Sequence, residues 1–202
     1  MKKKIKIKGT SYTHKILWPT AKYQMEAAKQ LPERKKYFYL SAMVMAFFTL
    51  ESYLNYLGEI IDPTTWKSEK LFFTEKPYIG TLGKLSFLIN KLGMLQFDRG
   101  KRPYQTIKQL KRIRDFLVHG RTEKYNGTVK YKDGSSPDLD VVKSYLEKHI
   151  SERKANIALE DTEQIIKELH HKAAKTHSQC EDFTSEPLDS GYYLKISDSF
   201  RI

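Results

Sequence analysis

The most constraining feature of this sequence is a long apolar stretch in its first third. Residues 33–61 place apolar side chains at the three- and four-residue spacing of an α-helix, and the pattern stops before Asp62-Pro63. At 1.5 Å per residue this helix would be about 40 Å long. Its longest unbroken apolar run, residues 42–50, is about half of what a bilayer span requires. We therefore predict the core helix of a soluble protein with no membrane partner.

Most of the remaining sequence also predicts helices. Pro19 and Pro103 suit the first turn of a helix, whereas Gly93 and Gly120 suit its end. Further helices are expected over residues 19–30, 82–92, 103–120, 138–149 and 161–177, the last starting with a capping-box pattern, and a loop is expected over residues 64–77. Alternating residues predict short strands at 3–9, 127–134 and 191–197.

These patterns together predict an all-α fold, an antiparallel bundle of about five helices. Short extended or hairpin-like pieces would lie at the termini and near residues 127–134. A length of 202 residues suits one domain with a real core. We expect a single domain over residues 1–202, with its helical core at about 20–175 and extended segments at both ends.

Charge and cysteine content indicate the class of partner and the cellular compartment. The net charge of +12 favours polyanionic partners, chiefly nucleic acid, although a generally basic solvated surface is the alternative. The single Cys180 cannot form an internal disulfide, which fits a reducing compartment. The basic first residues lack the apolar segment of a signal peptide, so we expect a cytoplasmic protein.

Two ionic residues fall on predicted apolar helix faces. At about 100° per residue, Arg114 lies within the apolar arc of its helix, and Glu51 lies between apolar residues of the long helix, with Asn55 at the arc's edge. Burying either charge alone would be costly, so we predict that Glu51 and Arg114 approach each other. A buried ion pair that only sets helix register is the alternative.

A histidine near this pair raises the possibility of catalysis. His119 follows Asp115 by four residues, so their side chains can meet on one helix face. An imidazole beside Arg114 would combine a proton-transfer group with a cation for a phosphorane, which is what phosphodiester chemistry requires. A plain helix-capping histidine is the alternative.

The surrounding segment is strongly basic. Residues 98–124 contain nine Lys or Arg and three Asp or Glu, half of the chain's excess charge. We take Lys108, Lys111, Arg112 and Arg121 as candidate RNA-binding residues, with a solvated helix face as the alternative. Three histidines and Cys180 near residues 170–180 lack the paired spacing of a zinc site, so no metal or cofactor is predicted.

These residues resemble the motifs of a known superfamily. Arg114-Asp115-x-x-x-His119, followed by Gly120, is similar to the R-x4-6-H motif of HEPN domains, in which a polar residue usually follows the arginine. The segment "FFTLESYLNYLGE", with Glu51 and Asn55, resembles the earlier long helix of those domains. The resemblance spans about residues 20–175, with two specific stretches.

The resemblance implies a helical bundle that dimerises with the two motifs facing across the interface. Many HEPN members are metal-independent endoribonucleases, and several act as toxins, with an antitoxin partner, or in antiviral defence. By this resemblance Arg114 and His119 would be catalytic, Asp115 would orient or polarise, and Glu51 and Asn55 would support. The implied reaction is attack of a ribose 2′-hydroxyl on the adjacent phosphate, which leaves a 2′,3′-cyclic phosphate.

One departure qualifies this assignment. One toxin branch carries tyrosine two residues after the histidine, where this chain has Arg121, so membership of that branch is in doubt. The alternative function is a non-catalytic HEPN-like module that binds RNA, a nucleotide or a protein partner.

Overall fold

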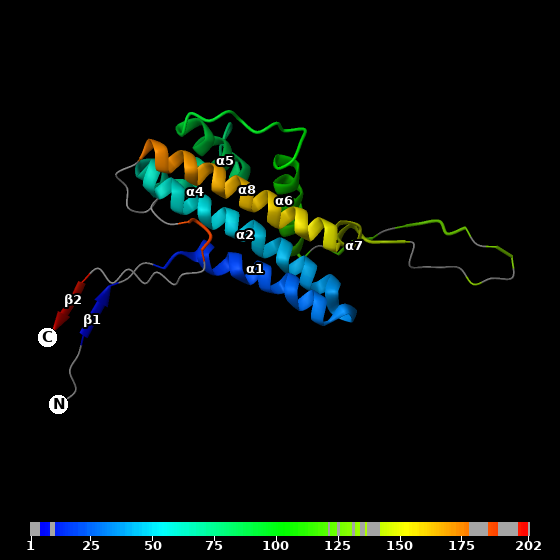
Figure 1. Cartoon of the computed structure of the whole chain (residues 1–202). Coiled ribbons are helices and arrows are strands. Elements are labelled where there is room, and N and C mark those ends of the chain that lie inside the picture. Colours follow the sequence, from blue (N-terminus) through cyan, green and yellow to red (C-terminus); the bar gives the residue numbers. More distant parts are fainter. Residues whose placement is uncertain are drawn as a thin grey trace.

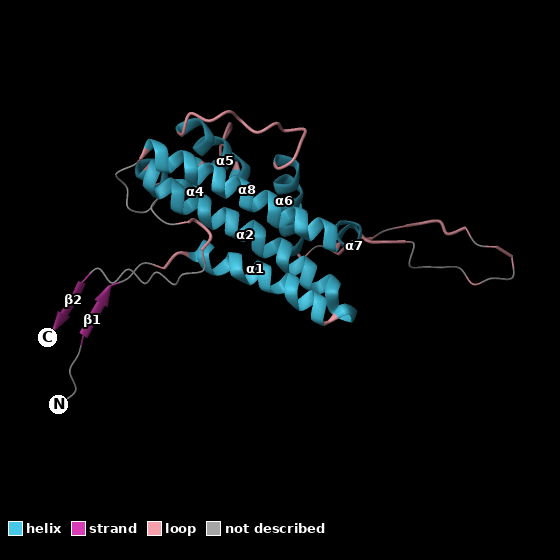
Figure 2. Cartoon of the chain, viewed as in Figure 1, coloured by secondary structure: helices cyan, strands magenta, loops and turns pink. Residues whose placement is uncertain are grey.

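The computed structural model describes residues 5–8, 11–120, 122–124, 126–130, 132–133, 136, 142–177, 186–189 and 198–201. It is mostly helical, as predicted, and the strands lie near the two termini (Figure 2). Within these ranges the longer helices are α1 (Thr13–Gln30), α2 (Lys35–Ile61), α5 (Gly80–Lys91), α6 (Tyr104–Val118) and α8 (Glu152–Thr176). The shorter elements are η1 (Pro32–Arg34), α3 (Pro63–Lys67), α4 (Glu69–Phe72), α7 (Tyr145–His149), β1 (Ile5–Lys8) and β2 (Asp198–Arg201).

Helix α2 is the centre of the bundle. It packs against α1, α5, α6 and α8, and α6 also contacts α8. In Figure 1, α1 runs antiparallel to α2, whereas α8 runs in the same direction as α2. The bounds of α2 agree closely with the predicted helix at 33–61: α2 begins at Lys35 and ends at Ile61, directly before Asp62-Pro63. The buried core contains Trp18, Phe47, Leu50, Leu54, Leu57, Leu85, Leu88, Ile107, Leu110, Ile113, Ile165, Ile166 and Leu169.

The segment Pro32–Ile61 is long and apolar enough to cross a membrane when judged by length and composition alone. Half of its most apolar window is buried inside the bundle. Burial of one large apolar side chain stabilises a fold by about 1.5–3 kcal/mol. The apolar character of α2 is therefore accounted for by its central position.

Helix α1 begins six residues before the predicted start, and Pro19 lies inside it. The prediction placed Pro19 in the first turn, where the missing amide hydrogen costs nothing. The earlier turns form because they bury His14 and Trp18, which are 1% and 2% exposed. Tertiary packing thus outweighs the local cost of an internal proline.

The predicted loop at residues 64–77 contains two short helices, α3 and α4, so that prediction was wrong. Asp62 caps α3 by accepting a hydrogen bond from the Thr65 amide at 3.1 Å. Trp66 is 6% exposed and packs edge-on against Phe73, with ring centroids 5.0 Å apart. A proline with an aspartate before it is a helix-start signal as well as a turn signal.

Helix α8 starts at Glu152, nine residues before the predicted start at Asp161. Ser151 is the cap, and its hydroxyl accepts from the Lys154 amide at 3.3 Å. Asp161 is instead an interior residue, 2% exposed, whose carboxylate accepts hydrogen bonds of 2.8–3.1 Å from Arg102. The polar side chain that suggested a cap is a buried ion-pair partner of Arg102, which lies just before α6.

The predicted strands are only partly found. β1 lies within residues 3–9 and pairs antiparallel with β2, Ile5 opposite Arg201. β2 follows the predicted strand at 191–197, a segment that lies outside the described residues. The described residues of 127–134 form no strand, and residues 131 and 134 lie outside the description.

The predicted helix at 138–149 is shorter in the structure. Helix α7 covers only Tyr145–His149, and residues 138–141 lie outside the described part of the chain. Ser144 and Glu147 form a complete capping box, because the Ser144 hydroxyl accepts from the Glu147 amide and the Glu147 carboxylate accepts from the Ser144 amide. This box sets the start of the helix.

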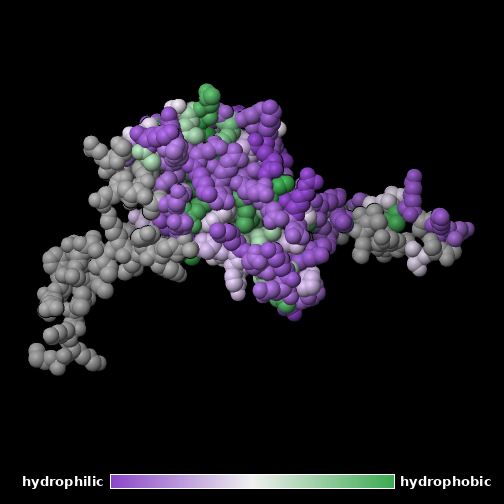
Figure 3. Space-filling model, viewed as in Figure 1, coloured by the Kyte–Doolittle hydropathy of each residue, from purple (hydrophilic) through white to green (hydrophobic). Residues whose placement is uncertain are grey.

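The face drawn in Figure 3 is mainly hydrophilic, with apolar residues in small separate patches. The helices therefore direct their charged and polar faces outward on this side.

Candidate functional site

The predicted approach of Glu51 and Arg114 is confirmed. Arg114 Nη2 on α6 donates to Glu51 Oε1 on α2 at 2.7 Å. The two side chains are 24% and 27% exposed, so the pair lies at the edge of the core. The Arg114 guanidinium also lies over the Phe47 ring, 5.4 Å from its centroid. A charge, a hydrogen bond and an aromatic face thus hold this guanidinium in one place.

A third helix contributes Thr81, which the sequence did not indicate. Thr81 lies in the first turn of α5, is 5% exposed, and donates its hydroxyl to the same Glu51 oxygen that Arg114 contacts. Glu51 therefore accepts from α5 and α6 while belonging to α2. No motif or periodicity marks Thr81, because its role depends on how α5 packs against α2.

Asp115 contacts two cations. Its Oδ1 atom lies 2.8 Å from Arg114 Nη1, and its Oδ2 atom lies 2.5 Å from Lys111 Nζ. The predicted meeting of Asp115 with the His119 ring is not found: within the described residues, no hydrogen bond or ion pair joins them. Asp115 instead extends the ionic chain that begins at Glu51.

The physical reason lies in where α6 ends. The helix stops at Val118, and His119 is its C-cap, with a backbone N–H that donates to the Asp115 carbonyl at 3.2 Å. The His119 side chain is exposed to solvent, and Asp115 pairs with Lys111 and Arg114 instead. Gly120 then has φ +54°, the left-handed conformation predicted for a helix-terminating glycine.

Asn55 belongs to a neighbouring polar cluster. Its side-chain oxygen accepts from Lys84 Nζ at 2.7 Å, and Lys84 also pairs with Glu69 at 2.5 Å. Asn55 and Glu51 thus lie one turn apart on α2, and each has its own partner on α5. Lys84 and Glu69 were not predicted, since Glu69 falls in the expected loop at residues 64–77 and no sequence pattern marks Lys84.

The predicted RNA-binding residues differ in how accessible they are. Arg112 is exposed, Lys108 is half-buried, and Lys111 is half-buried and paired with Asp115. Arg121 lies outside the described residues. Ion pairs with Glu51, Asp115 and the Glu160-Asp161 pair neutralise part of the basic segment.

No group of three or more His, Cys, Asp or Glu side chains in the described part of the chain is placed to hold a metal ion. Cys180 lies outside the described residues. The end of α6 and the facing part of α2 offer a positioned guanidinium, two carboxylates that orient it, and an exposed imidazole at the C-cap of α6. These groups match proton transfer and anion stabilisation.

Comparisons with protein-family models, with curated proteins and with solved structures find no match to this chain.

Proposed function

We propose that this protein is a metal-independent endoribonuclease that uses Arg114 and His119. The observation that carries the proposal is the continuous ionic chain from Glu51 through Arg114 to Asp115, which holds a guanidinium near the end of the helix whose C-cap is the exposed His119. The predicted resemblance to HEPN domains uses the same residues. Glu51, Thr81 and Asp115 act as positioning residues in this scheme.

The chemistry follows from the groups available. His119 accepts the proton of a ribose 2′-hydroxyl as its oxygen attacks the adjacent phosphorus. The bond from phosphorus to the 5′-oxygen breaks, and that oxygen takes a proton from a protonated imidazole. The products are a 2′,3′-cyclic phosphate and a free 5′-hydroxyl. General acid-base catalysis of this kind contributes typically 10²–10⁴-fold to a rate.

Arg114 retains donors for the phosphate. A guanidinium has five N–H groups, of which the contacts with Glu51 and Asp115 use one on each Nη atom. In this scheme the second N–H of each Nη atom would donate to a non-bridging phosphate oxygen. Anchoring before substrate arrives reduces the reorganisation needed in the transition state.

A second copy of the chain would complete the site. One chain supplies one well-placed imidazole, whereas the reaction uses a base and an acid, and a two-fold axis would duplicate His119. Val118, next to His119, is 63% exposed, which supports a contact at this end of α6. We infer a homodimer with the ends of α6 facing each other.

Cleavage of RNA in EDTA tests the proposal. The wild-type chain is expected to release 2′,3′-cyclic phosphate ends, and His119→Ala is expected to lose at least about 100-fold in rate. His171→Ala, which removes another exposed histidine on α8, is the matched control. Arg114→Lys keeps the charge but not the fork that pairs two carboxylates, so it should fold and cleave slowly. Full activity of His119→Ala with a wild-type circular dichroism spectrum would refute the assignment.

The second candidate is a non-catalytic RNA-binding module. The observation that favours it is that both Nη atoms of Arg114 are already paired inside the chain, as in a purely structural ion pair. In that case the wild-type chain retains RNA with an affinity that falls steeply with salt and releases no cyclic phosphate. A toxin or defence role stays a prediction; growth arrest on expression of the wild type, but not of His119→Ala, tests it.

A further inference from the structure

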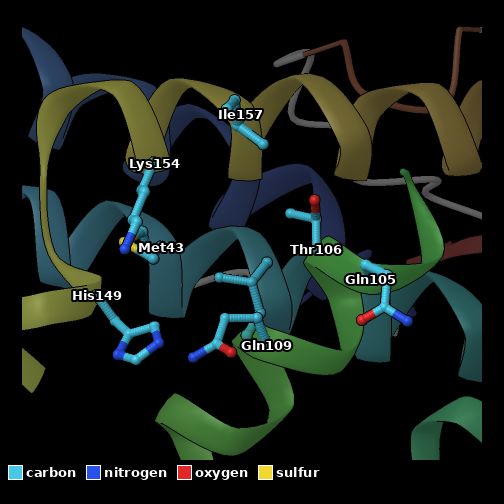
Figure 4. A pocket seen from close by; sticks show the side chains of 8 residues that line it. Met43, Gln105, Thr106, Gln109, His149, Lys154 and Ile157 are labelled. Atoms are coloured by element: carbon cyan, nitrogen blue, oxygen red, sulfur yellow. The ribbon is translucent and has the colours of Figure 1, made fainter. Parts of the chain in front are cut away.

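A cavity of about 300 Å³ opens between α2, α6, α7 and α8 (Figure 4). It lies on the first half of α6, whereas Arg114 and His119 belong to the end of that helix. Volumes of this size are at the lower end of those that hold small organic ligands. The proposed nuclease scheme uses none of the residues that line it.

The floor of the cavity is apolar. Met43 from α2 and Leu110 from α6 are each 2% exposed, and Ile157 from α8 is half-buried. In Figure 4 the side chains of Met43 and Ile157 lie between the helices from which they come. A surface of this composition releases water when an apolar or aromatic body covers it.

One wall is polar and held by hydrogen bonds. Gln109 Nε2 donates to the Tyr145 hydroxyl at 2.9 Å, and His149 Nδ1 lies 2.7 Å from the Tyr145 carbonyl oxygen. A carbonyl only accepts, so Nδ1 carries the hydrogen and Nε2 is the second polar edge of the ring. The His149 and Tyr145 rings also contact, with centroids 4.4 Å apart.

The mouth carries a positive charge. Lys154 is exposed, and its ammonium donates to the Lys148 carbonyl oxygen at 2.5 Å. Within the described residues Lys154 forms no salt bridge. The two nearest acidic residues along the chain have other partners: Glu152 accepts from the Tyr39 hydroxyl, and Glu160 pairs with Arg102. Among the residues that the structure describes, the Lys154 ammonium at the opening therefore has no carboxylate partner.

Two contacts between elements fix the relative positions of the cavity walls. Arg102, just before α6, pairs with Asp161 on α8, and Gln109 on α6 contacts Tyr145 on α7. The cavity lies between these two attachments. Its shape is thus set by the fold before any ligand binds, which lowers the entropic cost of binding.

We propose that this cavity binds a small aromatic anion. The planar body would lie on Met43, Leu110 and Ile157, and its carboxylate or phosphate would pair with the Lys154 ammonium. Both anions fit the observed charge, and the experiment below separates them.

Methionine-methyl NMR gives a site-specific test. The chain contains five methionines, and Met43 is the one that lines this cavity. Titration of the labelled full chain with 2-naphthoate or with 2-naphthyl phosphate should shift the Met43 methyl resonance, assigned with Met43→Leu. The Met25 and Met94 resonances should stay in place. The neutral 2-naphthamide should bind at least about tenfold more weakly than the anion, as expected for loss of a charge-assisted contact.

Two variants test the two halves of the proposal. Lys154→Gln should weaken anion binding about tenfold and leave binding of the amide unchanged, whereas Lys175→Gln, an exposed lysine at the other end of α8, should change neither. Ile157→Trp should fill the cavity and abolish the shift of Met43. Circular dichroism reports whether each variant is folded. If Ile157→Trp does not fold, the effect of Lys154→Gln on anion binding tests the proposal.

The outcomes are distinct. A Met43 shift with one anion alone identifies the carboxylate or the phosphate as the matching group. Equal binding of amide and acid, or an unchanged Kd in Lys154→Gln, overturns the anion assignment. No Met43 shift with either anion at millimolar concentration overturns the site.

Discussion

Protonation of a buried histidine should make this protein less stable in mild acid. His14 is 1% exposed, and its ring packs edge-on against Tyr53, with centroids 5.3 Å apart. Burial, followed by the nearby charges of Lys15 and His170, lowers the pKa of His14 from 6.5 to about 4. In the described residues its Nδ1 atom has no hydrogen-bond partner that could hold a proton there.

The sign and size follow from linkage. Between the two pKa values the unfolded chain binds a proton at His14 that the folded chain does not, so stability falls as the pH is lowered from about 6.5 toward 4. At 1.36 kcal/mol per pH unit, the full effect is about 3 kcal/mol, of which about 2 kcal/mol is lost between pH 7 and pH 5.

Urea unfolding of the wild type and of His14→Phe measures the loss of stability that protonation of His14 causes. Phenylalanine preserves the aromatic contact with Tyr53 and cannot be protonated. Fluorescence of Trp18 and Trp66, both buried, reports unfolding. The free energy of unfolding of the variant, relative to the wild type, should rise by about 2 kcal/mol between pH 7 and pH 5.

Carboxylates titrate in both proteins, so their contribution to the pH dependence of stability cancels in the difference between wild type and His14→Phe. His171→Asn, at an exposed position, should follow the wild-type profile. If the wild type and His14→Phe lose stability in parallel over this range, His14 is not held neutral by burial, and the reasoning fails.

Three further results are expected. Glu51→Gln and Arg114→Met should each lower the free energy of unfolding by about 1–3 kcal/mol, because each removes the ion pair between Glu51 and Arg114 at the edge of the core. A double-mutant cycle should give a coupling energy of about 1–2 kcal/mol between the two residues, and additive effects would contradict their pairing. Gly58→Ala should destabilise by about 1–3 kcal/mol, since its Cβ would lie 2.0 Å from the Trp66 ring, and an unchanged Tm would argue against that packing. Gly120→Ala should cost about 1 kcal/mol in urea unfolding at φ +54°, and a neutral effect would mean that the helix ends differently.

The helical fold class and the extent of α2 follow from sequence because they depend on local periodicity and on proline. The ion pair between Glu51 and Arg114 could also be predicted. Each residue interrupts an apolar helix face, and opposite charges on two core faces have a strong reason to meet.

Only the tertiary structure decided the starts of α1 and α8. In both cases burial outweighs a local signal: Pro19 lies inside α1 because His14 and Trp18 are buried before it, and Asp161 lies inside α8 because Arg102 neutralises it. A cap, an interior ion-pair partner and a loop residue can have the same local sequence.

The candidate site also combines features that the sequence predicts with features that only the packing of the helices determines. Arg114, Asp115 and His119 lie within six residues at the end of one helix, so the sequence alone places them in the same region of the chain. The partners of Asp115 and the contribution of Thr81 depend on where α6 ends and how α5 packs against α2. Local spacing determines which side chains can share a helix face, whereas packing between distant helices determines which of them meet.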